Sequence, residues 1–370
     1  MVDDSIAVYV EAPDVVGFGN EVWLFGYPTA AWLPSRSRPD SVAWLGFSYV
    51  GIRRSTTGTV RLVPAPAGHH AVEAPRAVVH RGRLHLVWAA PSGRREVDSL
   101  FHAEWLGTRW SAPSVVATGG AWEWGRTTAS HLLARNDTLF VAAPGGSAAD
   151  QFASLLRRAG GRWAERRIPS RSFLSYTALA LTPRELVLIE IGIPDSMRPG
   201  EHRQADVTAR LSTDGGTTWS PRRVLRSSTA SSPADARAVT TATGDVLAVW
   251  SSGQAGLTAD SLSVARRRDG FWGLPQTVDL PGEFVNFSAH SDGAAGVIAA
   301  VPGAGQDELH IAHWNEERWC LTRVPSAGTL PNPIAFSDSA GAYRIFWGRI
   351  HPYGSALAFH TNTAVVSRCC

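Results

Sequence analysis

The chain is a succession of short segments in which apolar and polar residues alternate, separated by turns that contain Gly, Pro or Asp. Alternation with a period of two residues is typical of β-strands that turn one face toward a core. No stretch of useful length has the periodicity of an amphipathic helix. The pattern therefore predicts an all-β protein whose strands follow one another as an antiparallel meander.

Three strand patterns repeat in a fixed order along the chain. An outer strand recurs near a Trp, with copies 47 to 56 residues apart, at Trp110, Trp163, Trp219, Trp272 and Trp319. That spacing is the length of one four-stranded propeller blade with its loops. Seven second strands are expected, at residues 21–25, 84–88, 138–142, 186–190, 246–250, 296–300 and 343–347. The repeats predict a single domain over residues 1–370, a seven-bladed β-propeller of four-stranded antiparallel blades around a central channel.

The connections and the ends of the chain complete this prediction. A third strand follows each second strand, and in the first blade we assign residues 42–48 to it. The longest connections between second and third strands, residues 27–41 and 192–205, are expected to be loops, either of which could cover the channel as a lid. Propellers hide their edges by completing the last blade from the other end of the chain. Residues 6–10 and residues 363–369 are alternatives for that strand.

One hairpin carries a motif of a known family. Residues 212–219 read Ser-Thr-Asp-Gly-Gly-Thr-Thr-Trp and match the Asp-box, S-x-D-x-G-x-x-W, and residues 268–272 are a degraded copy. On this motif the chain resembles the Asp-box (BNR-repeat) sialidase-like β-propellers. The resemblance implies a structural box, in which Asp214 accepts local hydrogen bonds and Trp219 packs between sheets. Sialidases of this kind typically have six blades, so a six-bladed ring is the alternative.

The catalytic motifs of that family are not retained. Sialidases carry an Arg-Ile-Pro motif in the first blade, an Arg triad for the substrate carboxylate, an Asp acid and a Tyr–Glu nucleophile pair. Here the first blade reads Glu11-Ala12-Pro13-Asp14, and the Arg-Ile-Pro at residues 167–169 falls in an outer strand. Likeness of fold does not transfer function, so true sialidase activity is not expected.

Alignment of the blades on their second strands places one residue of each blade at the start of its inner strand. Such positions lie on one ring at the channel mouth, and they are Asp14, Arg76, Ser130, Tyr176, Arg237, Phe287 and Ile334. Arg is rarely buried without a partner. The ring is therefore either a network of ion pairs that plugs the channel or a ligand site. In a ligand site, Arg76 and Arg237 bind an anionic group, Asp14 is the acid or base, and Tyr176 is a proton donor or an electrostatic partner.

Loops on the same face add polar and aromatic residues. His69 or His70 near Glu73 is a candidate acid–base pair, and exposed loop histidines without a role are the other interpretation. Tryptophans in a Gly-flanked loop suit stacking on a ligand. The residues expected to bind substrate, besides Arg76 and Arg237, are Trp122, Trp124, Arg126, Asp235 and His202.

Composition narrows the chemistry and the partners. All 35 basic residues are Arg, which suits bidentate contacts to carboxylates and excludes a Schiff base on Lys. The net charge is only +3, and we interpret the run at residues 266–268 as a solvated hairpin tip, so nucleic acid is not an expected partner. The three Cys lack a Cys-x-x-Cys pair, and no metal or other cofactor is expected. Neither a signal peptide nor a membrane span is recognised, which predicts a cytoplasmic protein without membrane partners.

Three functional hypotheses follow. The preferred one is an intracellular bacterial enzyme, monomeric or homodimeric, that acts in the channel funnel on a small polar or anionic substrate. That substrate is a glycoside or a secondary-metabolite precursor, and the chemistry is metal-independent acid–base catalysis of the hydrolase, lyase or cyclase type. The second is a non-catalytic, lectin-like glycan-binding propeller, which should repeat its binding motif in every blade. The third is a protein-interaction platform.

Overall fold

All regular elements described in the computed structural model of the chain are β-strands. No helix among the described residues has the length and apolar character needed to cross a membrane. The structure describes residues 7–35, 38–44, 49–55, 60–68, 73–91, 98–118, 132–147, 150–170, 172–194, 205–226, 232–253, 259–284, 287–292, 294–302, 308–325, 334–337, 343–346, 349–351 and 354–356.

Six antiparallel sheets of four or five strands follow one another along the described chain. Sheet 1 contains β1 (Ala7–Phe18), β2 (Glu21–Ser35), β3 (Arg38–Trp44), β4 (Tyr49–Ser55) and β5 (Val60–Pro64). Sheet 2 contains β6 (Glu73–His80), β7 (Arg83–Pro91), β8 (Asp98–Glu104) and β9 (Ser114–Thr118). Sheet 3 contains β10 (Leu133–Arg135), β11 (Thr138–Ser147), β12 (Asp150–Ala159) and β13 (Arg162–Pro169).

The remaining sheets repeat the same meander. Sheet 4 contains β14 (Ser172–Leu181), β15 (Leu186–Pro194), β16 (Asp206–Ser212) and β17 (Arg223–Arg226). Sheet 5 contains β18 (Ser232–Thr240), β19 (Val246–Gly253), β20 (Ala259–Arg268), β21 (Phe271–Trp272) and β22 (Gln276–Phe284). Sheet 6 contains β23 (Ser288–Ser291), β24 (Val297–Pro302), β25 (Glu308–Trp314) and β26 (Trp319–Pro325). Two hairpins follow, formed by β27 (Ile334–Ser337) with β28 (Tyr343–Phe346) and by β29 (Arg349–His351) with β30 (Gly354–Ala356).

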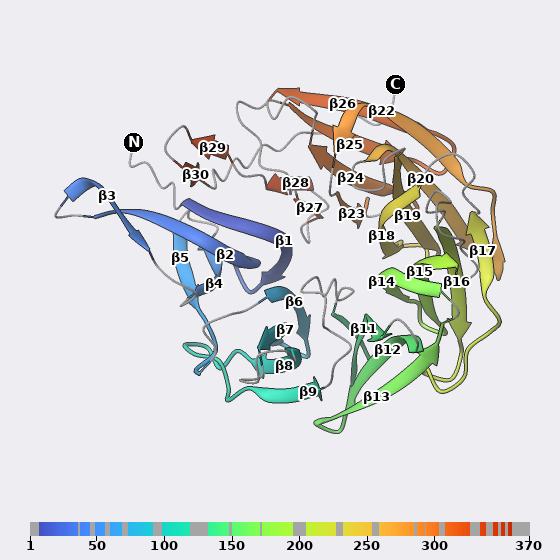
Figure 1. Ribbon diagram of the computed structural model, residues 1–370, viewed down its shortest axis with the longest axis horizontal. Helices are drawn as coiled ribbons and strands as arrows, with labels where there is room; N and C mark the ends of the chain where they lie inside the picture. The colour runs from blue at the N-terminus through green and yellow to red at the C-terminus, as the bar shows by residue number, and fades with distance from the viewer. Residues whose placement is uncertain are drawn as a thin grey trace.

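The sheets are arranged around a common centre (Figure 1). The first strands of successive sheets contact one another, in the order β1, β6, β10, β14, β18 and β23. Strand β27 contacts both β23 and β1 and so lies between the sixth sheet and the first. The predicted all-β propeller of antiparallel four-stranded sheets is confirmed at this level, and the first strands are its inner strands.

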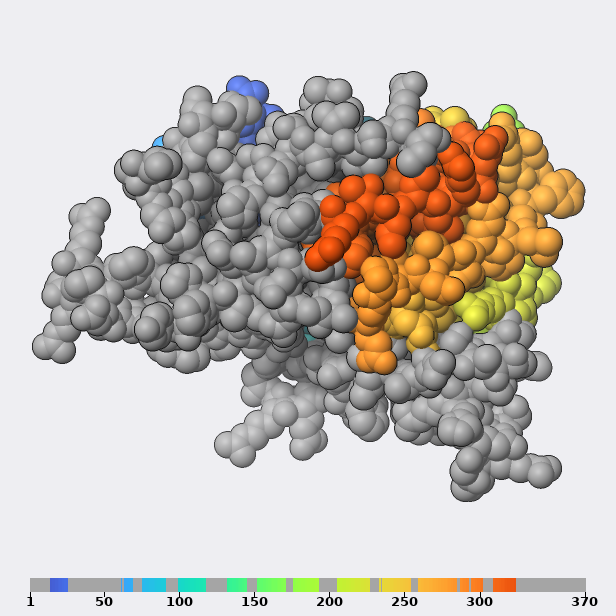
Figure 2. All heavy atoms as spheres, turned by 90° about the horizontal axis from the view of Figure 1, so that it is seen from above, coloured from blue at the N-terminus to red at the C-terminus, as the bar shows by residue number. Residues whose placement is uncertain are grey.

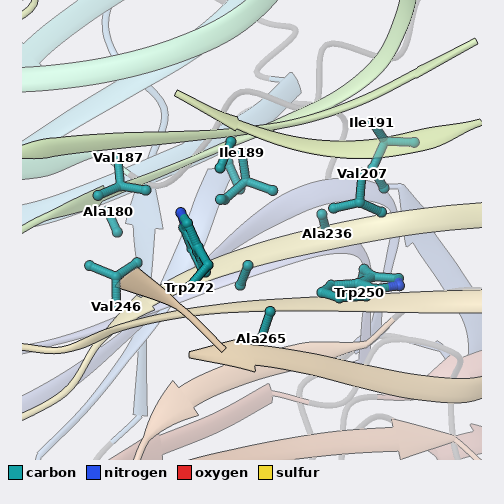
Figure 3. Close-up of a cluster of buried hydrophobic side chains, with 14 of the residues drawn as sticks. Ala180, Val187, Ile189, Ile191, Val207, Ala236, Val246, Trp250, Ala265 and Trp272 are labelled. Atoms are coloured by element: carbon teal, nitrogen blue, oxygen red, sulfur yellow. The ribbon is translucent and has the colours of Figure 1, made fainter. Parts of the chain in front are cut away.

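Neighbouring sheets pack through apolar side chains, and the second strands are the most deeply buried. Every residue of β19 is buried. Trp250 and Trp272 of sheet 5 pack against Val187 and other residues of sheet 4 (Figure 3). Leu247 and Val249, on the other face of β19, pack against sheet 6. On the face shown in the space-filling view, the described residues of sheets 5 and 6 adjoin one another (Figure 2).

Each expected second-strand segment overlaps a second strand of the structure, but sheet 1 departs from the prediction in its third strand. Its third strand is β4, whereas residues 42–44 lie in β3 and pair with the far end of β2. Most of residues 27–41, expected to be a loop, therefore belong to a β-hairpin that extends sheet 1. Residues 42–44 read Val-Ala-Trp, a short apolar run that suits a strand, but such a run does not specify which strand is the partner.

The start of the described chain does not complete a last blade. Residues 7–10 are the first part of β1 and pair with β2 inside sheet 1. The interpretation of residues 6–10 as a closing strand is therefore wrong for the residues that the structure describes. The alternative at residues 363–369 lies outside them.

Ion pairs join the sheets at the ends where the first strand turns into the second. Arg267 of β20 pairs with Glu185 of sheet 4. The neighbouring Arg266 pairs with Asp245 of its own sheet and Glu316 of sheet 6. The Arg run at residues 266–268 was expected to be a solvated tip, and this is wrong for its first two members, because side chains that alternate along the strand reach sheets on opposite sides.

The turn at residues 212–219 is held by its own side chains. Asp214 Oδ1 accepts hydrogen bonds from the Thr218 amide (2.9 Å) and the Ser212 hydroxyl (2.8 Å), and Oδ2 accepts one from the Thr218 hydroxyl (2.6 Å). Trp219 is partly buried against the apolar cluster of sheets 3 and 4. Gly216 has φ +90°, and a Cβ there would lie 2.0 Å from Leu155, so the turn requires glycine.

We predict that Asp214→Ala lowers the melting temperature at neutral pH and leaves ligand binding unchanged. The hydrogen bonds from Thr218, followed by that from Ser212, hold the pKa of Asp214 below its usual value of 3.8. A depressed pKa stabilises the fold above the ordinary pKa, and this contribution is lost as the pH falls below it. Thermal unfolding between pH 7 and pH 2 tests this, with exposed Asp279→Ala as control. An unchanged melting temperature at pH 7 would show that the turn does not depend on Asp214.

Candidate functional site

The same backbone irregularity occurs in four inner strands, immediately before four of the predicted site residues. The pairing register shifts just before Asp14 in β1, Arg76 in β6, Tyr176 in β14 and Asp235 in β18. A β-bulge changes the direction of the following side chains and is frequent beside functional sites. The repeated fold thus places all four residues within two positions of one another along the inner strands.

Asp14 joins the first two inner strands. Its side chain is buried, and Oδ2 accepts a hydrogen bond from the backbone amide of Ala77 in β6 at 2.7 Å. Oδ1 accepts one from the amide of Val15 at 3.0 Å. Both oxygens therefore bind backbone donors, which suits a carboxylate that fixes two blades together better than one that exchanges protons.

Arg76 is a buried guanidinium surrounded by the other charged residues of the ring. Its Nη1 donates a hydrogen bond to the carbonyl of Pro75 at 3.0 Å. Burial is the largest influence on its pKa and lowers it. The negative charges of Asp14 and Asp235 oppose that shift, while the positive charge of Arg237 adds to it. The charges of three further predicted site residues thus act on this one group.

Asp235 and Arg237 form an ion pair in β18 that also reaches sheet 6. Arg237 Nη1 donates to Asp235 Oδ1, which also accepts from the amide of Ala236 at 2.8 Å. Arg237 Nη2 donates to the carbonyl of Phe287 at 2.9 Å, and the guanidinium lies 5.1 Å from the centre of the Phe287 ring. Burial is the largest influence on the pKa of Asp235 and raises it, although Arg237 favours the ionised form.

Four of the predicted site residues therefore converge, namely Asp14, Arg76, Asp235 and Arg237. Tyr176 lies in the equivalent position of sheet 4, partly buried against the apolar cluster of sheets 4 and 5. Glu73 lies in β6, at a position whose side chain the structure does not describe. The remaining predicted residues lie outside the described residues, namely His69, His70, Trp122, Trp124, Arg126 and His202.

Glu190 in β15 is a buried acid that the sequence analysis did not select. It is fully buried, and its Oε2 accepts a hydrogen bond from Arg210 Nε at 3.0 Å. Its Oε1 has no hydrogen-bond partner among the described residues, and neither has the hydroxyl of Thr177, its cross-strand neighbour in β14. Burial is the largest influence on the pKa of Glu190 and raises it, against the opposing charges of Arg210 and Arg222.

A comparison of second strands makes Glu190 conspicuous. Each of these second strands has a row of side chains on the face toward the preceding sheet. Glu190 is the third residue of that row in sheet 4, as Trp88 is in sheet 2 and Trp250 is in sheet 5. The strands of sheets 2 and 5 carry a fully buried Trp at this position, so an ionisable Glu is unexpected there. This signal was readable in the aligned second strands.

We predict that Glu190→Gln removes a pH dependence of stability. Because burial raises the pKa of Glu190, the folded state retains its proton at a pH where the unfolded state has lost it. Stability from this group is therefore present at acid pH and declines as the pH rises above its ordinary value of 4.5, by about 1.4 kcal/mol for each unit of raised pKa.

Denaturant unfolding across pH 4–8 measures this effect. Relative to the parent chain, Glu190→Gln should become progressively more stable as the pH rises, whereas Glu317→Gln at an exposed position should not. A constant difference between Glu190→Gln and the parent across that range would contradict the assignment.

Comparison with known proteins identifies shared architecture. No protein-family model matches the chain, and no curated protein matches it. Among solved structures, the chain is similar to the polysaccharide lyase Uly1, with 12% identity, a TM-score of 0.60, and 94% of this chain and 90% of that chain covered. It is also similar to a PL25 ulvan lyase bound to -[GlcA(1-4)Rha3S]-, with 9% identity, a TM-score of 0.57, and 95% and 93% of the two chains covered.

A third similar structure is the Trypanosoma rangeli sialidase, with 12% identity, a TM-score of 0.49, 95% of this chain covered and 54% of the longer sialidase chain. At these identities the likeness concerns the fold. The chain therefore shares the propeller fold of the two polysaccharide lyases over nearly its whole length.

Proposed function

We propose that this protein is an enzyme that binds an anionic saccharide at the channel mouth and acts on it by acid–base chemistry. The proposal rests on the hydrogen bonds of Arg237, which occupy only some of its N–H donors. Its side chain is 23% exposed, and three of the five N–H donors of a guanidinium are bonded, to Asp235, Ala236 and Phe287. In the described part of the chain, two donors remain for a ligand.

The fixed position of Arg237 favours recognition over a purely structural role. Three hydrogen bonds and the Phe287 ring hold the guanidinium in place, so its free donors need little further ordering to pair with a substrate carboxylate or sulfate. Arg76 raises the positive potential behind it. An anionic ligand would thereby gain charge-assisted hydrogen bonds in a partly desolvated site.

Asp235 is the acid or base that best fits this geometry. Both of its hydrogen bonds in the described part of the chain are accepted by Oδ1, so Oδ2 is available to a substrate proton. Burial raises the pKa of Asp235 above its usual value, a direction that favours proton exchange by an active-site carboxyl. Asp14, whose two oxygens both bind backbone amides, is a positioning residue in this proposal.

The saccharide class is supported by fold likeness together with the ring. The ulvan lyase with the same fold was solved with an acidic saccharide bound, and that protein and Uly1 are polysaccharide lyases. Fold likeness alone does not assign a reaction, so elimination and hydrolysis both remain within the proposal. Each requires a positioned acid or base, the role proposed for Asp235.

The ring geometry in this proposal has seven blades. The C-terminal strands β27–β30 would form the seventh blade, because β27 contacts β23 on one side and β1 on the other. A six-bladed ring would require direct contact between sheet 6 and sheet 1 in place of β27.

Turnover of oligosaccharides tests the proposed function. Uronic-acid and sulfated oligosaccharides, with neutral ones for comparison, are incubated with the chain, and both unsaturated products and new reducing ends are measured. Arg237→Ala should lower kcat/KM for the anionic substrates by about 10- to 150-fold, the scale of one or two charge-assisted hydrogen bonds. Arg268→Ala, on an exposed side chain, is the matched control.

Two outcomes would contradict the proposal. Loss of thermal stability in Arg237→Ala with unchanged kcat/KM would make the ring a structural plug. Binding of glycans without any turnover, unaffected by Arg237→Ala, would favour the lectin-like alternative.

A further inference from the structure

A second cluster of polar side chains lies between sheets 2 and 3, away from the inner strands. His85 on β7 and His102 and Glu104 on β8 belong to sheet 2, and Arg158 and Trp163 face them from sheet 3. Both imidazoles are only 3% exposed. The ion pairs of Arg266 and Arg267 join other sheets without any histidine, so this junction has a different composition.

The atoms of this cluster are spaced as the ligands of one metal ion would be. His85 Nδ1 lies 3.1 Å from His102 Nε2 and 3.9 Å from Glu104 Oε1, and the ligand atoms of all three residues lie within 4.8 Å of one another. Two nitrogens bound tetrahedrally to zinc at its usual bond length are about 3.4 Å apart. The two imidazoles therefore need only a small shift to share an ion.

Both imidazoles are chemically prepared for coordination. Burial lowers the pKa of His85 to about 4 and that of His102 to about 3. Both rings are consequently neutral at pH 7, so neither ring carries a second proton that would have to leave before it binds a metal. The hydrogen bond joins the two nitrogens that would bind the ion, so the ring that donates its N–H must shift that proton to its other nitrogen.

We propose that His85, His102 and Glu104 bind one zinc-like divalent transition-metal ion that fastens sheet 2 where it meets sheet 3. Two imidazoles and one carboxylate are a zinc donor set, and a water molecule completes the fourth position. Magnesium and calcium prefer oxygen ligands and fit this set poorly. The site is distinct from the saccharide site proposed at the channel mouth.

Two arginines compete with the ion for Glu104. Arg158 Nη2 lies 2.8 Å from Glu104 Oε1, and Arg83 Nη1 lies 3.0 Å from Oε2. Their charges oppose a cation, so the ion must displace at least one of them. The Arg83 side chain is 67% exposed and can turn into solvent, whereas Arg158 is held between the sheets. His80, whose ring centre lies 5.9 Å from that of His85, also borders the site.

Because the arginines compete with the ion, a zinc site and a structural ion pair respond differently to substitution. Removal of Arg83 should tighten zinc binding, because it frees Glu104 and removes a like charge, while removal of an imidazole should weaken it. A cluster that serves only as an ion pair would respond to neither change, since zinc would not be bound there.

Zinc binding by the full-length, chelator-treated chain tests the site. Competition with a chromophoric chelator should give one zinc per chain and a rise in melting temperature on zinc addition. His85→Ala and His102→Ala should each weaken binding at least 10-fold, and Arg83→Ala should strengthen it several-fold. His290→Ala, which removes a histidine of sheet 6, is the control and should leave the affinity unchanged.

The assignment is overturned by zinc binding that is unaffected by both histidine variants, or by the absence of stoichiometric binding in the parent chain. If either histidine variant does not fold, Arg83→Ala decides alone, because its exposed side chain can be removed without loss of the core. An unchanged or weakened zinc affinity in Arg83→Ala would then contradict the site.

Discussion

Burial of the second strands on both faces is the constraint on which the rest of the structure depends. A strand such as β19, with every residue buried, must have an apolar neighbour on each side. A sheet with two apolar faces can satisfy this only between two other sheets, and a ring of sheets gives every member two neighbours. The ring in turn brings the inner strands together at the centre. Polar side chains at the starts of the inner strands therefore lie close together, although they are far apart in the sequence.

This proximity places buried charged groups beside one another, which costs desolvation free energy and lets opposite charges interact strongly. Burial shifts the pKa of Arg76 and Asp235 toward their neutral forms, and the opposite charges around them oppose the shift. Asp14 opposes the shift of Arg76 by its charge and fixes β6 to β1 through the backbone amide of Ala77. Arg237 differs because it is anchored and still partly exposed. The same fold that stabilises the ring therefore leaves one anchored guanidinium partly exposed.

The sequence predicted those features that repetition encodes. Second strands were recognisable because each is a short, mostly apolar segment that recurs at blade spacing, and Asp14, Arg76 and Arg237 followed from aligning them. Features that depend on pairing between distant strands were missed. Residues 42–44 have a strand pattern but pair with β2, and Arg267 reaches Glu185 in another sheet. His85 and His102 meet only through the register of β7 with β8. Glu190 lies inside a strand and not in a loop, and the equivalent positions of sheets 2 and 5 hold Trp88 and Trp250.

The proposed function requires that Arg237 and its neighbours bind an anionic saccharide. A crystal structure of the chain soaked with a uronic-acid disaccharide would show whether they do. We expect one ligand per chain at the channel mouth, with its carboxylate about 2.7–2.9 Å from the free donors of Arg237 and a hydroxyl or ring proton near Asp235 Oδ2. Ligand bound only at the outer edges of the blades, with the charged ring unoccupied and unchanged, would contradict it.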